Sequence, residues 1–277
     1  NFIEGRYDHL LDHLSTCKSP QQMFGALSKS YYSEITGIDP KDIYTVSIMP
    51  CTAKKFEAQR PEMKTNGVQE VDAVLTTREL ARMIESAGID FVDLEEGQFD
   101  NPFGIGTGAG AIFGATGGVM EAALRTAYEV ITGKGLPNLN FTEVRGLEGI
   151  KESTVDIDGL ELKVAVAHGL GNAKKLLKQI EKGESPYAFI EIMACPGGCI
   201  GGGGQPIKST MDVKAKRIDA IYQIDEDLPL RKSHKNPDVM ELYEKYLGEP
   251  LGHKSHELLH THYKSRGLKY NFAELME

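Results

Sequence analysis

Short apolar segments alternate with longer amphipathic segments along this chain. Four runs are apolar enough to form buried strands: residues 43–49, 71–75, 162–167 and 187–193. Helical spacing of apolar residues occurs three times: at Leu80, Met83 and Ile84, over residues 119–132, and over residues 173–182. Thr76 precedes the first of these helices and Glu79 lies three residues later, which is the spacing of a capping box. Strands separated by helices favour an α/β fold with a mostly parallel β-sheet flanked by helices.

The chain is long enough for two domains, with 277 residues. Pro229, Pro237 and a cluster of charges mark residues 225–238 as a linker, and residues 239–277 have the pattern of two or three helices. We therefore expect a main domain over residues 1–224 and a helical C-terminal wrapping segment over residues 225–277.

Charge and hydropathy exclude several kinds of partner. The formal net charge of −9 argues against a nucleic acid partner, because phosphate binding requires clustered Lys and Arg. No stretch of about 18 apolar residues is present, so no membrane span is expected. The chain starts at Asn1 within a helical pattern and without a secretory leader, so we expect a processed product or a portion of a longer protein.

The four cysteines are too few for a disulfide-built fold. Cys51 and Cys195 each follow a predicted strand, and in open α/β sheets ligands bind beyond the carboxyl ends of strands. Cys199 lies four residues further on, in a run of glycines that lets the backbone wrap around a bulky group. Soft thiolates select iron–sulfur clusters, zinc or copper(I). Buried core cysteines beside a flexible loop remain the alternative, and a structural zinc site is weaker because only one short Cys spacing is present.

Two motifs contain these cysteines and resemble a known family. Residues 49–57 (Met-Pro-Cys-Thr-Ala-Lys-Lys-Phe-Glu) and residues 191–206 (Glu-Ile-Met-Ala-Cys-Pro-Gly-Gly-Cys-Ile-Gly-Gly-Gly-Gly-Gln-Pro) are similar to the second and third signature motifs of the iron-only (FeFe) hydrogenases. The similarity extends through residues 14–22, 112–125 and 258–263. The chain thus resembles the C-terminal portion of the large-subunit catalytic domain, with a fused tail similar to the small subunit.

The resemblance implies an H-cluster, which is a 4Fe–4S cubane joined through one cysteine to a di-iron subcluster with carbon monoxide, cyanide and a bridging dithiolate amine. Cys51 and Cys195 match ligands of the cubane, and Cys199 matches the cysteine that bridges the two parts. Lys54 matches a lysine that hydrogen-bonds cyanide, and Ser15 matches a serine on the proton route. The residues that match the lining of the di-iron pocket are Gln21, Met49, Pro50, Phe113 and Met193.

Each of these side chains also has an ordinary structural interpretation. Lys54 could be a solvated lysine, although its position three residues after Cys51 places it about one helical turn away. The two methionines could be core residues. Ser15 could cap a turn, and Gln21 could simply follow Pro20 at a helix start.

The first signature motif of the family, Thr-Ser-Cys-Cys-Pro-Gly-Trp, is absent from this sequence. That motif supplies a fourth cubane ligand and a proton-transferring cysteine, and Cys17 is no obvious replacement. We therefore expect the chain alone to be inactive and to hold no complete H-cluster, and the sequence leaves open whether it binds any metal.

For the parent protein the resemblance implies reversible reduction of protons to hydrogen in the cytoplasm. It also implies an electron source, either ferredoxin or a nicotinamide- or flavin-linked electron-transfer subunit, and hydrogenase maturation proteins as partners.

Four other functions compete with this one. His256-Glu-Leu-Leu-His260 matches the HExxH pattern of zinc proteases. Glycines at 104, 106, 108 and 110 resemble a dinucleotide-binding loop, although no strand pattern precedes them. Iron–sulfur assembly proteins and hydrogen-sensing relatives share the hydrogenase motifs. Lys54, Gln21 and Met193 favour the enzyme over the assembly proteins.

Overall fold

A computed structural model describes residues 1–267 of the chain. The residues fall into two compact units, each made of segments that are separate in sequence. Unit 1 comprises Asn1–Ser47, Phe56–Ala73 and Tyr246–Glu277, and unit 2 comprises Ile48–Lys55 and Val74–Lys245. The predicted division between residues 224 and 225 lies inside helix α9 (Met211–Asp227) and stays a prediction. The last residues of the predicted C-terminal segment, 268–277, lie outside the described part of the chain.

Unit 1 is built mainly from short helices. Its elements are α1 (Phe2–Arg6), η1 (Asp8–His13), α2 (Pro20–Leu27), η2 (Ser28–Tyr32), α3 (Ser33–Thr36), the antiparallel pair β2 (Lys64–Thr65) and β3 (Val68–Gln69), and α11 (His253–Leu259). Helix α2 begins as its sequence predicts, with Ser19 as the N-cap and Pro20 in the first turn. Gly25 lets α2 pack closely against the backbone of Glu70, since a Cβ at position 25 would lie 2.6 Å from the Glu70 carbonyl oxygen.

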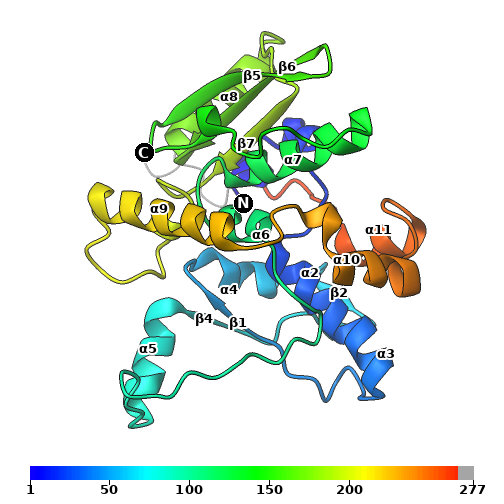
Figure 1. Cartoon of the computed structure of the whole chain (residues 1–277), viewed down its shortest axis with the longest axis vertical. Coiled ribbons are helices and arrows are strands. Elements are labelled where there is room, and N and C mark those ends of the chain that lie inside the picture. The colour runs from blue at the N-terminus through cyan, green and yellow to red at the C-terminus, as the bar shows by residue number, and fades with distance from the viewer. Residues whose placement is uncertain (268–277) are drawn as a thin grey trace, which may run out of the picture. The chain divides into compact units, whose positions relative to one another are not determined.

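Unit 2 contains a three-stranded sheet with one helix on each face (Figure 1). Its strands are β5 (Ile150–Ile157), β6 (Leu160–His168) and β7 (Phe189–Met193). The β5–β6 pair is antiparallel and the β6–β7 pair is parallel. Val164 and Val166 pack with Met120 of α7 (Gly118–Thr132). Ala165 and Ala167 point the other way and pack with α8 (Leu170–Glu181), as the two-residue period of a strand requires.

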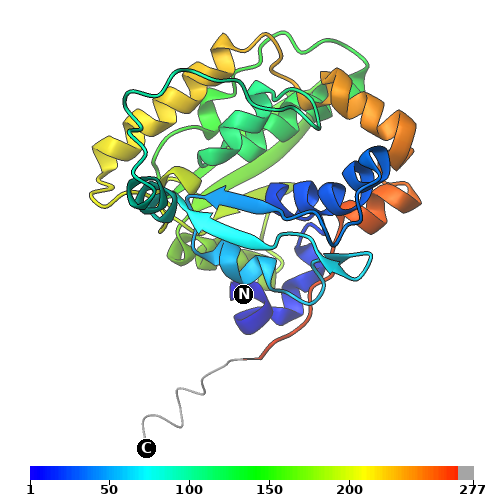
Figure 2. The ribbon, with the colours of Figure 1, turned by 90° about the horizontal axis from the view of Figure 1, so that it is seen from below.

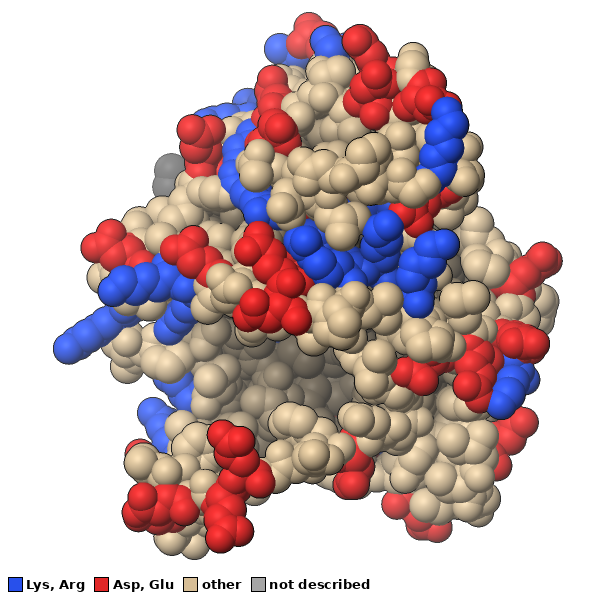
Figure 3. Space-filling model, in the orientation of Figure 1, with Lys and Arg blue, Asp and Glu red and all other residues tan. Residues whose placement is uncertain are grey.

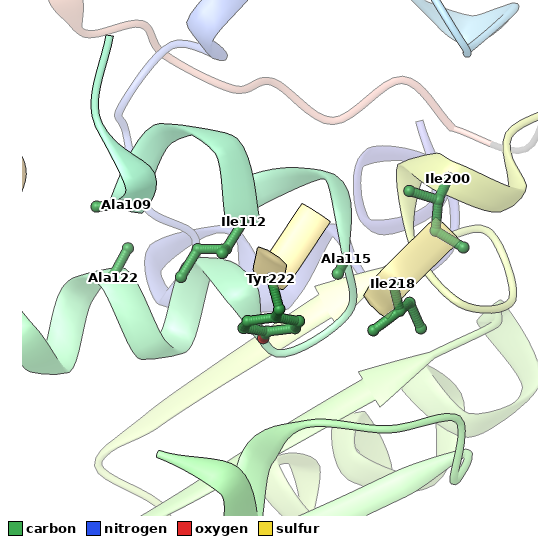
Figure 4. Packing of buried hydrophobic residues seen from close by; sticks show 7 residues of the cluster. All are labelled: Ala109, Ile112, Ala115, Ala122, Ile200, Ile218 and Tyr222. Atoms are coloured by element: carbon green, nitrogen blue, oxygen red, sulfur yellow. The ribbon is translucent and has the colours of Figure 1, made fainter. Parts of the chain in front are cut away.

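A second core of unit 2 lies among helices (Figure 4). It joins α6 (Gly108–Ala111), η3 (Ile112–Gly114), α7, η5 (Cys199–Gly201) and α9. Its buried members are Ala109, Ile112, Ala115, Ala122, Ile200, Ile218 and Tyr222. Ile200 directly follows Cys199, so this core anchors the glycine-rich loop.

The remaining elements are β1 (Val46–Met49), α4 (Ala53–Ala58), β4 (Ala73–Thr76), α5 (Thr77–Ser86), η4 (Thr142–Val144), η6 (Ser233–Lys235), α10 (Pro237–Leu242) and η7 (Tyr243–Leu247). Strands β1 and β4 lie side by side as a two-stranded sheet (Figure 2). The predicted capping box is present at the start of α5, where Thr76 and Glu79 bond each other's backbone N–H groups.

The predicted α/β class is confirmed, and all four predicted strands and three predicted helices are present. The expectation of one mostly parallel sheet is corrected to three small sheets, in which β2–β3 and β5–β6 are antiparallel. The sequence pattern does not predict strand β5, because only three of its eight residues, Ile150, Val155 and Ile157, are apolar. The Asp158–Gly159 pair that joins it to β6 has positive φ angles of 54° and 91°, as a two-residue hairpin turn requires.

Candidate functional site

Three of the four cysteines belong to unit 2. Cys51 follows β1, Cys195 follows β7, and Cys199 opens the single turn η5. All three are half-buried, and none forms a disulfide. Cys17 is exposed and belongs to unit 1, where its backbone forms an isolated antiparallel β-bridge with His260. The pattern of strands ending in cysteine is thus present as predicted.

The glycine-rich loop crosses the end of β1 and meets Cys51. The Gly204 N–H donates to the Pro50 carbonyl oxygen at 2.9 Å. A Cβ on Gly202 would lie 2.1 Å from that same oxygen, and one on Gly204 would lie 2.9 Å from the Pro50 carbonyl carbon. Only glycine permits this approach, and it brings the residue before Cys51 against the loop that carries Cys195 and Cys199.

The electrostatics of the thiols also show that they share one environment. Burial, followed by the charge of Cys51, raises the pKa of Cys195. Burial again comes first for Cys199, whose pKa is raised further by Cys51 and Cys195 and lowered by Lys54. Like charges disfavour ionisation, so a cation between the sulfurs would release their protons. An ammonium group and three thiols therefore act on one another in this part of unit 2.

The donor set fits an iron–sulfur cluster better than a single ion. Within residues 1–267, no three His, Cys, Asp or Glu side chains come close enough to hold one metal ion together. A cubane instead presents a different iron to each thiolate, so its ligands stand further apart than those of one ion. Three half-buried free thiols also supply the soft donors that iron–sulfur clusters select.

A second close approach fixes the start of the loop. Gly198 has a φ of 93°, and a Cβ there would lie 2.7 Å from the Thr116 backbone nitrogen. The Thr116 N–H donates to the Gly197 carbonyl oxygen at 3.1 Å. The turn that precedes α7 therefore lies directly on the segment between Cys195 and Cys199.

Glu191 ties the same turn to strand β7. Its side chain is buried, and it accepts hydrogen bonds from the Gly117 N–H at 2.6 Å and from the Met120 N–H at 2.7 Å. These N–H groups lie at the start of α7, where a helix has unpaired donors. Burial raises the pKa of Glu191, against these bonds and the charge of Lys151, which lower it. The role of Glu191 was missed, because the sequence shows only an acidic residue within a strand.

Five predicted site residues besides the cysteines lie in unit 2. Met49 ends β1, Pro50 contacts the loop, Lys54 lies in the first turn of α4, and Met193 ends β7. Phe113 lies in η3 and packs against the core that contains Ile200. These side chains belong to unit 2 with the three cysteines. Their predicted roles stay predictions.

Gln21 and Ser15 belong to unit 1. Gln21 is buried at the start of α2, where its side-chain oxygen accepts from the Ser47 hydroxyl at 2.7 Å and its amide donates to Glu57 at 3.4 Å. The Ser15 hydroxyl oxygen accepts from the Cys17 N–H at 3.3 Å. This is the turn-capping contact that the structural alternative for Ser15 predicts.

The HExxH segment does not have the arrangement of a zinc protease. His256 lies in α11, but His260 lies just beyond the helix end with an extended backbone. The two rings stack at 4.4 Å between centroids, with only 10° between their planes. The Nδ1 atom of His260 pairs with the Thr16 hydroxyl at 2.8 Å. Stacked rings cannot direct two nitrogens at one zinc ion, so this alternative is not supported.

Gly104 and Gly108 are closely packed, as the structural alternative predicts, whereas a Cβ on Gly106 would meet nothing within 4 Å and Gly108 begins helix α6. No strand is present over residues 87–107, so the context of a dinucleotide-binding loop is missing. A Cβ on Gly108 would lie 2.1 Å from an Asp225 carboxylate oxygen, which shows how closely α6 packs on α9.

Within residues 1–267 no helix has the length and apolar character needed to cross a bilayer.

Comparison with known proteins gives the same family over both parts of the chain. Residues 1–203 match the model for the iron only hydrogenase large subunit, C-terminal domain, and residues 211–266 match the iron hydrogenase small subunit. The NADP-reducing hydrogenase subunit HndD of Solidesulfovibrio fructosivorans is 53% identical over 266 residues, which are 96% of this chain and 45% of that protein. Iron hydrogenase 1 of Clostridium pasteurianum is 49% identical, over 94% of this chain and 46% of that protein.

More distant relatives and solved structures agree. A cytosolic Fe–S cluster assembly factor of Danio rerio is 33% identical over 92% of this chain and 64% of that protein. A solved structure of the FeFe-hydrogenase HydA1 from Chlamydomonas reinhardtii matches with a TM-score of 0.83 and 48% identity, and it covers 96% of this chain and 74% of that chain. The chain spans about half the length of the hydrogenases to which it is most similar in these comparisons. The chain belongs to the iron-only hydrogenase family.

Proposed function

We propose that the protein containing this chain is a hydrogenase that reversibly reduces protons to hydrogen at an H-cluster. The observation that carries the proposal is the meeting of the glycine-rich loop with the end of β1, through the contacts of Gly202 and Gly204 with Pro50. Cys51 and Cys195 would bind the cubane, and Cys199 would join it to the di-iron subcluster. When bound, that subcluster supplies the site of proton reduction.

The side chains of this chain have three tasks in the proposal. Lys54 donates to an anionic cyanide ligand, and its ammonium charge already acts on Cys199. Met49, Pro50, Phe113 and Met193 line a pocket with few donors that excludes water. Ser15 carries protons.

The similarity to an NADP-reducing hydrogenase subunit supports a nicotinamide-linked electron-transfer subunit as the electron source, with ferredoxin as the alternative. One relative, 57% identical over 206 residues, is named as a periplasmic large subunit. This chain instead matches the models of both the large and the small subunit. The fusion of the two parts in one chain supports a cytoplasmic protein.

Residues 225–277 would act as the small-subunit-like segment, which the match over residues 211–266 supports. The three thiolates give the chain alone an incomplete ligand set, and we expect no turnover from it without a fourth ligand.

Anaerobic reconstitution with ferrous iron and sulfide tests the thiolate site. The expected product is an iron–sulfur cluster with a paramagnetic signal after reduction, and C195S should lose it. The matched control C17S changes a cysteine outside the site and should retain the full iron content. Equal iron loss in both variants, or equal retention, would contradict the ligand assignment.

Hydrogen evolution by the parent protein after maturation tests the activity itself. The assembly function is the second candidate, because the assembly factors are also similar over most of the chain. A K54Q variant separates the two: a hydrogenase should lose most of its hydrogen evolution and keep its cubane. A parent protein that holds a cubane but evolves no hydrogen would support the assembly function instead.

A further inference from the structure

Unit 1 contains a pocket of about 760 Å³ that the cysteine site does not use. Its walls come from α1, the β2–β3 region, α11 and the segment that follows α11. Pockets of about 300–1,000 Å³ are typical of small-molecule sites. The histidines of the HExxH segment, which the proposed hydrogenase function leaves without a role, line it.

The pocket is positive, although the chain is acidic overall. Five Lys or Arg side chains line it, against three Glu, whereas the whole chain has 31 Lys and Arg and 40 Asp and Glu. On the face drawn in Figure 3, basic and acidic side chains lie interspersed. An excess of cations around one cavity therefore distinguishes this pocket from an ordinary surface, and a cavity focuses its field.

Part of this charge forms a fixed wall. Arg60 donates two hydrogen bonds to the buried Glu4 carboxylate, at 2.9 Å and 2.6 Å. Arg266 lies 3.4 Å from the same carboxylate. The hydrogen bonds from Arg60 hold the pKa of Glu4 well below its usual range, so this wall stays ionised at neutral pH.

Lys18 is paired with the buried Glu70 at 2.5 Å, but two other cations of the pocket are not neutralised. Lys64 and Lys264 line it, and within residues 1–267 neither ammonium group has a carboxylate partner. The centroid of the His256 ring lies 4.4 Å from that of His260 and 6.4 Å from that of His262. No hydrogen bond to the His256 ring or the His262 ring exists in the described part of the chain. Two ammonium groups and two imidazole rings can thus donate to a ligand.

We propose that this pocket binds a small molecule that carries phosphate groups. Two ammonium groups and imidazole N–H donors around one cavity match a group with two or more charges on a few atoms. A phosphate has this property and a single carboxylate does not. The volume admits more than one phosphate group. The site is separate from the cysteines in its residues and does not depend on the proposed hydrogenase function.

Titration of the full chain with inorganic pyrophosphate, followed by calorimetry at about 0.1 M salt, tests the proposal. We expect saturable binding that weakens at least tenfold in the double variant K64Q/K264Q. The matched control K174Q removes an exposed lysine of α8 in unit 2 and should bind as the wild type does. Binding that is absent, or that the control weakens equally, would overturn the proposal.

Two further arms keep the result interpretable. Citrate should bind at least tenfold more weakly than pyrophosphate, and equal binding would overturn the assignment to phosphate. Far-UV circular dichroism checks that the double variant is folded. If it is not, the single variant K264Q, outside any regular element, carries the same prediction with a smaller loss of affinity.

Discussion

Replacement of Glu191 by Gln tests whether strand β7 and helix α7 position the cysteine loop together. Glu191 is 5% exposed, and both of its carboxylate oxygens accept backbone N–H groups at the start of α7. Gln keeps the shape but replaces one acceptor oxygen with an NH2 group. One N–H of Gly117 or Met120 then faces another donor.

The expected loss of stability follows from two opposing effects. A hydrogen bond to a charged group contributes about 1.5–3 kcal/mol, and a negative charge at a helix N-terminus adds about 0.3–1 kcal/mol. Burial penalises the ionised carboxylate, as its raised pKa shows, so removal of the charge recovers part of the loss. We expect Glu191→Gln to lower the free energy of unfolding of unit 2 by about 2 kcal/mol.

Urea unfolding followed by far-UV circular dichroism measures this change, since the chain has no Trp. Glu161→Gln is the matched control, because Glu161 is exposed on β6 and should change stability by less than about 0.5 kcal/mol. Alkylation of Cys195 and Cys199 by iodoacetamide should also become faster in Glu191→Gln, because local opening of the loop exposes the thiols. A Glu191 variant with the stability and alkylation rates of the control would refute this reasoning.

Three further perturbations have expected outcomes. Gly202→Ala should destabilise the chain by about 1–3 kcal/mol and reduce its iron uptake. The control Gly171→Ala in α8 should stabilise the chain by about 0.5–1 kcal/mol. Urea midpoints and iron content measure both effects, and equal effects would contradict the close approach at Gly202. Burial lowers the pKa of Lys151 from 10.5 to about 8, so the unfolded chain binds the extra proton between these values. Wild-type stability should therefore rise relative to Lys151→Met from pH 8 to 10.5, and a constant difference in urea unfolding would contradict it. Asp225→Asn should cost about 3–5 kcal/mol at pH 7, because it breaks the fully buried pair with Arg125. Burial raises the pKa of Asp225, but its hydrogen bonds with Arg side chains outweigh this and lower it, so the difference should shrink as pH falls below 3.8. A difference that stays constant or grows as the pH is lowered would contradict the sign.

Much of the local structure could be predicted from sequence because its causes are local. The Thr76–Glu79 capping box depends on residues three apart, and both of its hydrogen bonds are present. The second half of β6 is buried on both faces, so its apolar composition alone marks it. The apolar run of β7 is equally visible in the sequence, although Glu191 is its one buried residue. The α/β class follows from such segments.

The errors in the predicted sheet have an equally physical origin. Strand β5 is buried at alternate positions only, so its hydrophobic signal is half that of β6. The Asp158–Gly159 pair carried the missing information, since it favours a hairpin and hence an antiparallel neighbour. Apolar runs alone therefore predict a mostly parallel sheet and omit the antiparallel strand β5.

The sequence by itself determined which atoms could form the candidate site: three thiols, one ammonium group and a run of glycines, in an order similar to that of the iron-only hydrogenases. Tertiary structure decided how that loop is held. Glu191 lies more than 70 residues from the N–H groups that it binds, and Pro50 lies about 150 residues from the glycines that pack on it. A residue pattern records preferences over a few neighbours, whereas such contacts depend on where the whole chain places each backbone group.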